Sequence, residues 1–236
     1  MDLNRFSTRD KDALDRPIWS SLTSKHRSFA LGVGRACRYP PAVSPFAAVS
    51  EFSAAAMCDL RDLAKNGPVA LVSLSKLEPL EGLKVRVEVT LHQMILTDDV
   101  SSAWEASATI LGPHDVPSML ELAALTRPGP FYPETHRLGR YVGVRDGTRL
   151  VAMAGERLSF DGFTEISAVG VHPDYRGKGY AKILIGELAK MIFSRGETPI
   201  LHVHDGNLSA IALYKRLGFV TRTNFHFTLM NLSDAS

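Results

Sequence analysis

Apolar residues in the second half of the chain recur at strand spacing in some segments and at helical spacing in others. Helical spacing predicts helices from Asp115 to about Leu125, from Tyr180 to Ser194 and from Asn207 to Leu217. Strands are predicted between them, at residues 108–111, 139–145, 150–158, 163–171, 199–204 and 225–230. The pair Asp146-Gly147 separates two of these strands and is typical of a tight hairpin turn.

The first half of the chain gives fewer clear patterns. Ser53 to Lys65 is predicted as a helix that Asn66-Gly67-Pro68 ends, and Val69 to Leu74 as an apolar strand. Alternation from Val85 to Leu91 predicts a strand with one solvated face. The remaining segments are predicted as a loosely attached arm (1–25), a short strand (27–35), a loop (39–45) and a polar connection (98–102).

The order of elements in the second half is strand, helix, three strands, helix, strand, helix, strand. This order predicts an α+β layered fold, with helices on both faces of a mixed sheet. A chain of 236 residues can form one large domain or two smaller ones. We expect a division into residues 1–104 and 105–236.

Composition limits the classes of partner. The formal charge of +2 is close to neutral, so neither a nucleic acid nor a membrane surface is expected as a partner. The polar N-terminus does not resemble a signal peptide, and no apolar run reaches the length of a membrane span. Cys37 and Cys58 are the only cysteines, which favours a reducing, cytoplasmic location and argues against a structural zinc site. We therefore expect no metal.

The segment from Val169 to Ala181 contains the strongest functional signal. A predicted strand ends at His172-Pro173, a turn follows with Gly177 and Gly179, and a helix begins at Tyr180. Such a turn directs backbone N–H groups at a phosphate, and Arg176 and Lys178 add positive charge. Neither a Walker A loop nor a dinucleotide fingerprint fits this spacing.

The pattern that does fit is Arg-x-x-Gly-x-Ala, at Arg176 to Ala181, followed by Asn207…Ala210-x-x-Leu213-Tyr214-x-x-x-Gly218-Phe219. Together these elements resemble the acyl-CoA loop and the second conserved element of the GNAT superfamily of N-acetyltransferases. The resemblance covers roughly residues 108–230. It implies a mixed, mostly antiparallel sheet, acetyl-CoA as cosubstrate, and a first half that is either a degenerate GNAT-like copy or an unrelated substrate-side domain. The residues it implies for cofactor binding are Val169, Gly170, Val171, Arg176, Gly177, Lys178, Gly179, Tyr180, Ala181 and Asn207.

Several of these positions have a structural explanation as well. Gly170 fits close ligand approach or a bulge, and equally a packing glycine under a helix. Asn207 is expected to contact the cofactor, to cap its own helix, or both. Tyr214, two helical turns after Asn207, is the candidate acid, and a half-buried core tyrosine is the alternative.

Glu165 is the candidate base because it lies four residues before Val169, on the same face of the predicted strand. The alternative is a surface glutamate, with Glu156 as the substitute base. His202 and His204 share a strand face and suit a metal, a base or simply a polar face. The aromatic residues expected either to line an acceptor pocket or to form core are Phe131, Tyr132, Phe225 and Phe227.

The function expected from the resemblance is acetyl transfer from acetyl-CoA to a primary amine by direct attack. The acceptor is expected to be a small molecule or an amino acid. A protein N-terminus or lysine is the alternative acceptor, and a non-catalytic acyl-CoA-binding module is the alternative class. A homo-oligomer is compatible with the sequence.

Overall fold

The second half of the chain folds in the predicted order in a computed structural model, which describes residues 6–32, 34–98 and 108–233. Its elements are β5 (Thr109–Leu111), α4 (Val116–Thr126), β6 (Tyr141–Asp146), β7 (Arg149–Phe160), β8 (Phe163–Val171), α5 (Tyr180–Phe193), β9 (Thr198–His204), α6 (Leu208–Arg216) and β10 (Val220–Leu232). Gly147 in the hairpin and Gly218 after α6 have φ of 56° and 90°. Side chains disfavour these conformations, which is why glycine ends both elements.

The first half contains more regular structure than its sequence predicted. Its elements are α1 (Thr8–Asp15), α2 (Pro17–Thr23), β1 (Ala36–Arg38), β2 (Ala47–Val49), α3 (Ala54–Ala64), β3 (Val69–Ser73) and β4 (Leu83–Ile95). The predictions of α3, β3 and β4 are confirmed. Contrary to prediction, the first part of β4 is exposed on both faces, with Val85 and Val87 at 46% and 42% exposure.

The prediction of a loose N-terminal arm was wrong for the described residues. Ser7 and Asp10 form a capping box at the start of α1, and Leu14, Ile18 and Leu22 are buried. Leu14 is the buried residue of α1, and the spacing of four residues places Ile18 and Leu22 on the packed side of α2. The strand expected at 27–35 was also wrong, since Arg27–Phe29 is a 3-10 turn and β1 begins at Ala36.

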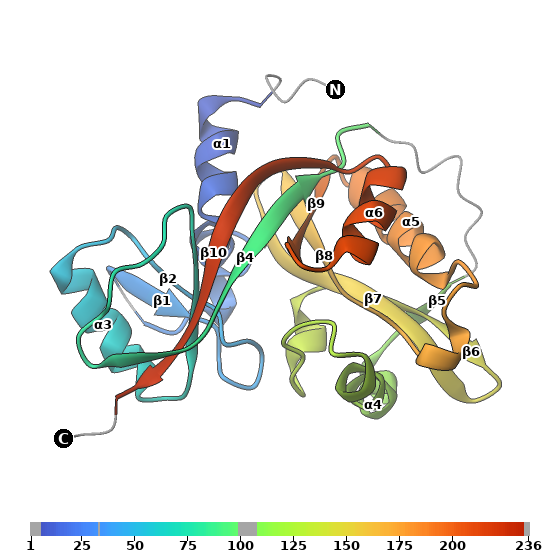
Figure 1. Ribbon diagram of the computed structural model, residues 1–236, viewed down its shortest axis with the longest axis horizontal. Coiled ribbons are helices and arrows are strands. Elements are labelled where there is room, and N and C mark those ends of the chain that lie inside the picture. Colours follow the sequence, from blue (N-terminus) through green and yellow to red (C-terminus); the bar gives the residue numbers. More distant parts are fainter. Residues whose placement is uncertain (1–5, 33, 99–107, 234–236) are drawn as a thin grey trace.

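Both halves contribute to one 8-stranded sheet with the order β3-β10-β4-β9-β8-β7-β6-β5. Strand β4, from the first half, lies between β9 and β10 and is antiparallel to each (Figure 1). Only the β8–β9 pair is parallel among the strand pairs of this sheet within the described residues. The predicted α+β class with a mostly antiparallel sheet is confirmed. The boundary expected at residues 104/105, and all but the first residue of the connection expected at 98–102, lie outside the described residues.

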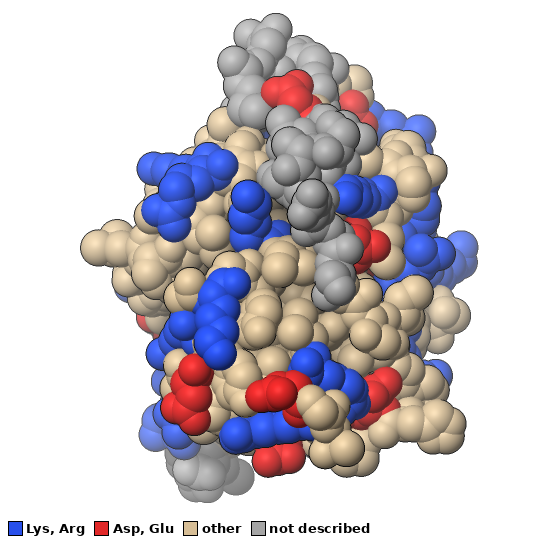
Figure 2. Space-filling model, turned by 90° about the vertical axis from the view of Figure 1, so that its right-hand side faces the viewer, with Lys and Arg blue, Asp and Glu red and all other residues tan. Residues whose placement is uncertain are grey.

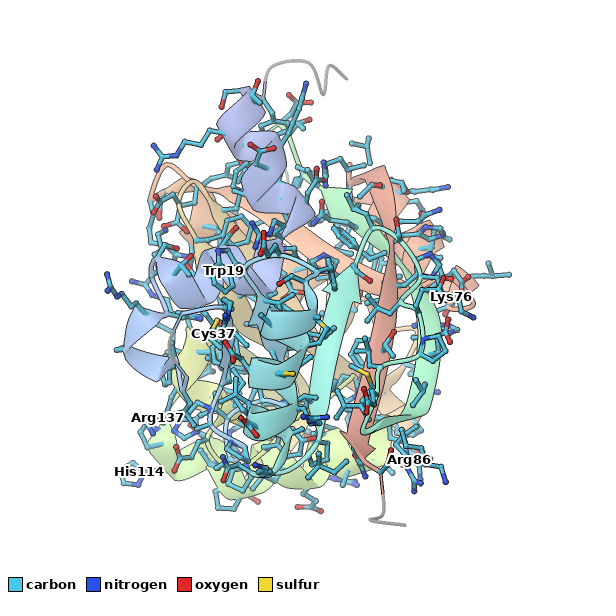
Figure 3. All side chains as sticks on the ribbon, turned by 90° about the vertical axis from the view of Figure 1, so that its left-hand side faces the viewer. Trp19, Cys37, Lys76, Arg86, His114 and Arg137 are labelled. Carbon is cyan, nitrogen blue, oxygen red and sulfur yellow. The ribbon has the colours of Figure 1, made fainter. Side chains whose placement is uncertain are left out.

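Helices cover both faces of this sheet. Helices α5 and α6 pack on one face through a core that includes Leu184, Leu188 and Ile211. Helix α4 packs on the other face, against Tyr141 and Met153. Figure 3 shows the end built by the first half, where α2 with Trp19 and α3 lie beside β3, β10 and β4. The sheet is therefore the common framework on which residues from both halves are placed.

Candidate functional site

The turn between β8 and α5 has the conformation that its glycines predict. Gly177 and Gly179 have φ of 78° and 81°, and a Cβ at either position would meet no atom within 4 Å. The glycines are therefore required by backbone conformation and not by crowding. The surface beside them is open to a ligand.

Successive amide groups in this turn have no acceptor among the described residues. Residues 177–182 comprise the end of the turn and the first residues of α5. Their backbone N–H groups donate no hydrogen bond to any described residue. The first amides of a helix have no intrahelical partner and carry the positive end of the helix dipole. Arg176 lies beside them. This row of donors suits an anion such as a diphosphate.

Lys178 differs from the prediction in its placement. It is not among the residues that line the adjacent cleft, and its Nζ lies 4.6 Å from the centroid of the Tyr175 ring. Its charge is nevertheless held at the turn.

Strand β8 separates from β9 at the middle of the sheet. Their pairing is confined to residues 163–165 of β8 and 198–200 of β9. The register between β7 and β8 shifts beyond Ser167, and Ala168 has a φ of 52°, which marks a bulge. The edge of β8 that faces β9 beyond Glu165 thus has no strand partner among the described residues, and its main-chain groups are available to a ligand.

Val169, Gly170 and Val171 follow this bulge and line the cleft. For Gly170 the packing explanation holds, since a Cβ there would lie 2.6 Å from Oγ1 of Thr126 in α4. A ligand is not needed to explain this glycine.

Tyr214 faces the same cleft from α6. Its ring packs against Phe219, with centroids 6.0 Å apart, and its hydroxyl has no hydrogen-bond partner among the described residues. Burial raises the pKa of Tyr214 to about 12, so the hydroxyl keeps its proton at neutral pH. Asn207 caps α6, because its Oδ1 accepts from the N–H of Ala210 at 3.2 Å, and it also lines the cleft.

These elements enclose one cleft of about 900 Å³. Of the predicted cofactor-binding residues, all but Lys178 line it. Several residues that complete the cleft wall were not predicted from the sequence: Phe46, Val89, Leu91, residues 126–130, and Arg157. Figure 2 shows the side of the molecule at the right of Figure 1, where Lys and Arg side chains are spread around a mainly uncharged centre instead of forming one basic patch.

Glu165 lies behind the cleft wall and not at its surface. Its exposed fraction is 0%, so the alternative of a surface glutamate was wrong. Its Oε2 accepts from Nε of Arg157 at 2.9 Å and its Oε1 from Nη2 of Arg157 at 2.6 Å. Burial alone would raise the pKa of Glu165, but the charge and hydrogen bonds of Arg157, followed by those of His202, lower it to about 2. Neither carboxylate oxygen of Glu165 contacts the cleft. This geometry does not fit the predicted role of Glu165 as a base that takes the proton directly.

His202 continues this polar network across the sheet. Its Nδ1 lies 2.8 Å from Oε1 of Glu165, and its Nε2 lies 3.1 Å from Nε2 of Gln93. Gln93 accepts from Arg222 through Oε1 and donates to the carbonyl of Leu14 through Nε2, which fixes the orientation of the amide. The Gln93 amide therefore donates to Nε2 of His202, and Nδ1 of His202 donates to Glu165.

The remaining predicted side chains lie as follows. Glu156 is buried, is bound to Arg195 and to the N–H of Arg140, and does not line the cleft. His204 lines the cleft, and its Nδ1 accepts from the N–H of Gly206. Of the four aromatic residues, Phe227 lines the cleft, Phe225 is buried, Phe131 is half-buried, and Tyr132 is exposed. Within the described residues, no group of three or more His, Cys, Asp or Glu could hold a metal ion, and no helix is both long and apolar enough to cross a membrane.

A family model described as FR47-like protein matches residues 141–228. The crystal structure of a putative acetyltransferase from the GNAT family from Novosphingobium aromaticivorans is 38% identical, with a TM-score of 0.87, and the match covers 94% of this chain and 99% of that one. A GCN5-related N-acetyltransferase from Kribbella flavida has a TM-score of 0.59 at 16% identity over 92% of this chain and 95% of its own, which shows a shared fold.

Curated relatives match over a shorter segment. The N-alpha-acetyltransferase RimI of Mycobacterium tuberculosis is 40% identical over 84 residues, which is 34% of this chain and 51% of RimI. An acetyltransferase of Yersinia pestis is 40% identical over 55 residues, covering 23% of this chain and 39% of the relative. The chain thus spans about half of the length of RimI and 39% of that of the Yersinia relative.

The Novosphingobium protein is similar along nearly the whole of both chains, and the Gly177 turn, the separated β8 edge and Tyr214 meet in one cleft. This chain belongs to the GNAT family of acetyltransferases.

Proposed function

We propose that this protein transfers an acetyl group from acetyl-CoA to the primary amine of a small molecule or amino acid, by direct attack of the amine. The observation that supports this most is the single cleft that joins the open amides of residues 177–182, the unpaired edge of β8 and the hydroxyl of Tyr214. A protein that only binds acyl-CoA would need only the open amides. Acetyl transfer also needs the unpaired edge of β8 and the hydroxyl of Tyr214.

The residues of the turn fit the cosubstrate. The amides of residues 177–182 and the positive end of α5 would bind its diphosphate, with the guanidinium of Arg176 adjacent. Acetyl-CoA supplies a thioester-activated acetyl group when bound. The unpaired edge of β8 near Val169 would donate main-chain N–H groups to the acyl oxygen, and such fixed donors are worth about 10²–10³ in rate.

Tyr214 would stabilise the departing sulfur by donating a hydrogen bond to it. Its pKa of about 12 is roughly 3–4 units above that of an ordinary thiol, so complete proton transfer would cost about 5 kcal/mol. The energetics therefore favour hydrogen-bond donation from the Tyr214 hydroxyl over full transfer. The proton that the thiol finally carries would come from the attacking amine through solvent.

No ionised carboxylate among the described residues lines the cleft to accept the ammonium proton. His202 has its acceptor nitrogen occupied by Gln93, and Glu165 has its oxygens occupied by Arg157 and His202. We assign Glu165 a positioning role, in which it holds Arg157 and His202 in place. The ammonium proton would leave to water in the cleft.

The test is thiol release from acetyl-CoA in the presence of a library of primary amines, with the Tyr214→Phe protein beside the wild type. Amine-dependent release that falls in the variant supports the proposal. Binding of acetyl-CoA without release by any amine would favour the binding module. The similarity to RimI over 84 residues makes a protein N-terminus the second candidate acceptor, and N-terminal peptides belong in the same library.

A further inference from the structure

The charged side chains that line the cleft are all basic. They are Arg127, Arg157, Arg176, Lys182 and Arg216, and within the described residues no Asp or Glu accompanies them. Arg176 and Lys182 lie at the turn and start of α5, beside the amides suited to a diphosphate. Arg157 lies elsewhere, on β7, beside Phe46 from the first half of the chain. It is therefore available to a ligand other than the cosubstrate.

Arg157 is held rigidly. It is 9% exposed, its Nε and Nη2 both donate to Glu165, and its Cζ lies 4.9 Å from the centroid of the Phe46 ring. A planar guanidinium that is fixed at two nitrogens also has a fixed direction for the third. The direction of Nη1 is thus set before any ligand arrives.

Nη1 of Arg157 has no acceptor among the described residues, although an arginine nitrogen carries two N–H donors. It lies 3.8 Å from the point where a Cβ on Gly129 would stand, and Gly129 and Arg157 both line the cleft. Nη1 is not one of the buried atoms without a partner, so it is open to the cleft, where a ligand oxygen can replace water. The arrangement therefore suits a ligand oxygen in the space between Nη1, Gly129 and the rings of Phe46 and Phe227.

A second unsatisfied group belongs to the same region. The hydroxyl of Tyr141 is the buried side-chain polar atom that lacks a hydrogen-bond partner within the described part of the chain. Burial raises the pKa of Tyr141, and the charge of Arg157 is the largest influence that opposes this rise. Two polar groups within electrostatic reach of each other thus have hydrogen-bonding capacity that the protein does not use.

We infer that the acceptor amine also carries a carboxylate, and that Nη1 of Arg157 donates to this carboxylate. This inference rests on the proposed function and narrows it to acceptors of the amino-acid type. A polyamine or an aminoglycoside would meet only like charges in this cleft. A peptide N-terminus would present a neutral carbonyl, which accepts a weaker hydrogen bond from a guanidinium than a carboxylate does.

The experiment compares matched acceptors: apolar amino acids, their primary amides, and the amines that lack the carboxyl group. Rates of thiol release are expressed per concentration of neutral amine, because an amide or a missing carboxylate changes the pKa of the amine. The expected kcat/KM for the amino acid exceeds that for its amide by about tenfold to a hundredfold, as for a hydrogen bond to a charged group.

Arg157→Lys keeps one positive charge but lacks the planar guanidinium with its several N–H donors. We expect it to reduce the preference for the amino acid over its amide to below about threefold. Arg157→Gln/Glu165→Gln replaces the pair by neutral side chains of similar shape, and serves if the lysine variant does not fold. Affinity for CoA, measured by calorimetry, should be unchanged in both. Arg9→Lys is the matched control, because Arg9 pairs with Asp161 at the exposed surface, and it should retain the full preference.

Equal or better use of amides or peptides by the wild type would overturn this inference and leave the proposed function standing. Retention of the carboxylate preference in a folded Arg157→Lys protein would also overturn it. Binding of acetyl-CoA without acetylation of any acceptor would overturn the proposed function and this inference with it.

Discussion

Replacing Glu165 by glutamine tests the buried network that supports the cleft. Glu165 is fully buried and accepts hydrogen bonds from Nε and Nη2 of Arg157 and from Nδ1 of His202. Glutamine keeps the shape but leaves the Arg157 charge uncompensated. Removing one partner of a buried ion pair costs about 3–5 kcal/mol. The lowered pKa of Glu165, about 2 against an ordinary 4.5, has the same sign, because the folded state favours the ionised carboxylate.

The pH dependence has a definite sign. The pKa of Glu165 is lower in the folded than in the unfolded state, so its contribution to stability is present above pH 4.5 and is lost as the pH falls toward 2. Between pH 7 and pH 3 the wild type should lose about 2 kcal/mol through this group. Glu165→Gln should not show this loss.

Urea unfolding at pH 7 and at pH 3 measures both effects. Glu88→Gln is the matched control, because Glu88 pairs with Lys76 in a largely solvated ion pair and should cost less than about 1 kcal/mol. A Glu165→Gln protein that unfolds at the wild-type urea concentration, with the same acid sensitivity, would refute the reasoning.

Three further substitutions and one pH profile have expected outcomes. Tyr214→Phe should lower kcat by about 10²-fold, with CoA affinity unchanged by calorimetry; an unchanged kcat would remove Tyr214 from the mechanism. Gly179→Ala forces a side chain into a φ of 81° and should weaken CoA binding about tenfold, from a strain of 1–2 kcal/mol, whereas Gly147→Ala, equally strained but in the remote hairpin, should not. Tyr141→Phe removes a buried hydroxyl without a partner and should raise the free energy of unfolding by about 1 kcal/mol; a loss of stability would show that the hydroxyl is satisfied. Because no carboxylate among the described residues faces the cleft, the pKa seen in the kcat/KM profile should follow that of each acceptor amine, and a constant pKa would point to a base on the protein.

Local signals predicted well the backbone features on the side of the cleft where we propose that acetyl-CoA binds. The Gly177 and Gly179 turn, the bounds of β8 and the Asn207 cap all depend on interactions within a few residues, which a single sequence displays. Helix α1 also had a local signal, the Ser7–Asp10 capping box, that the polar composition of the segment obscured.

The acceptor side could not be predicted in the same way. Leu91 reaches the cleft through the pairing of β4 with β9 and β10, and Phe46 through its bridge to Ala70 of β3. Such partners are not encoded in local periodicity. The sequence did contain a signal for the burial of Glu165. Arg157 and Glu165 each lie within an apolar strand segment, and oppositely charged residues in such segments favour a buried pair over a surface position.

The position of β4 in the sheet has a consequence for dividing the chain. A fragment that begins at residue 108 would lack the strand between β9 and β10, so it would present two long open edges and should aggregate instead of folding. The two halves should nevertheless reassemble when they are produced together as separate polypeptides, since each supplies what the other leaves unpaired. Recovery of acetyl transfer on co-expression would then report directly on the contact between them, and the chain would serve as a split enzyme.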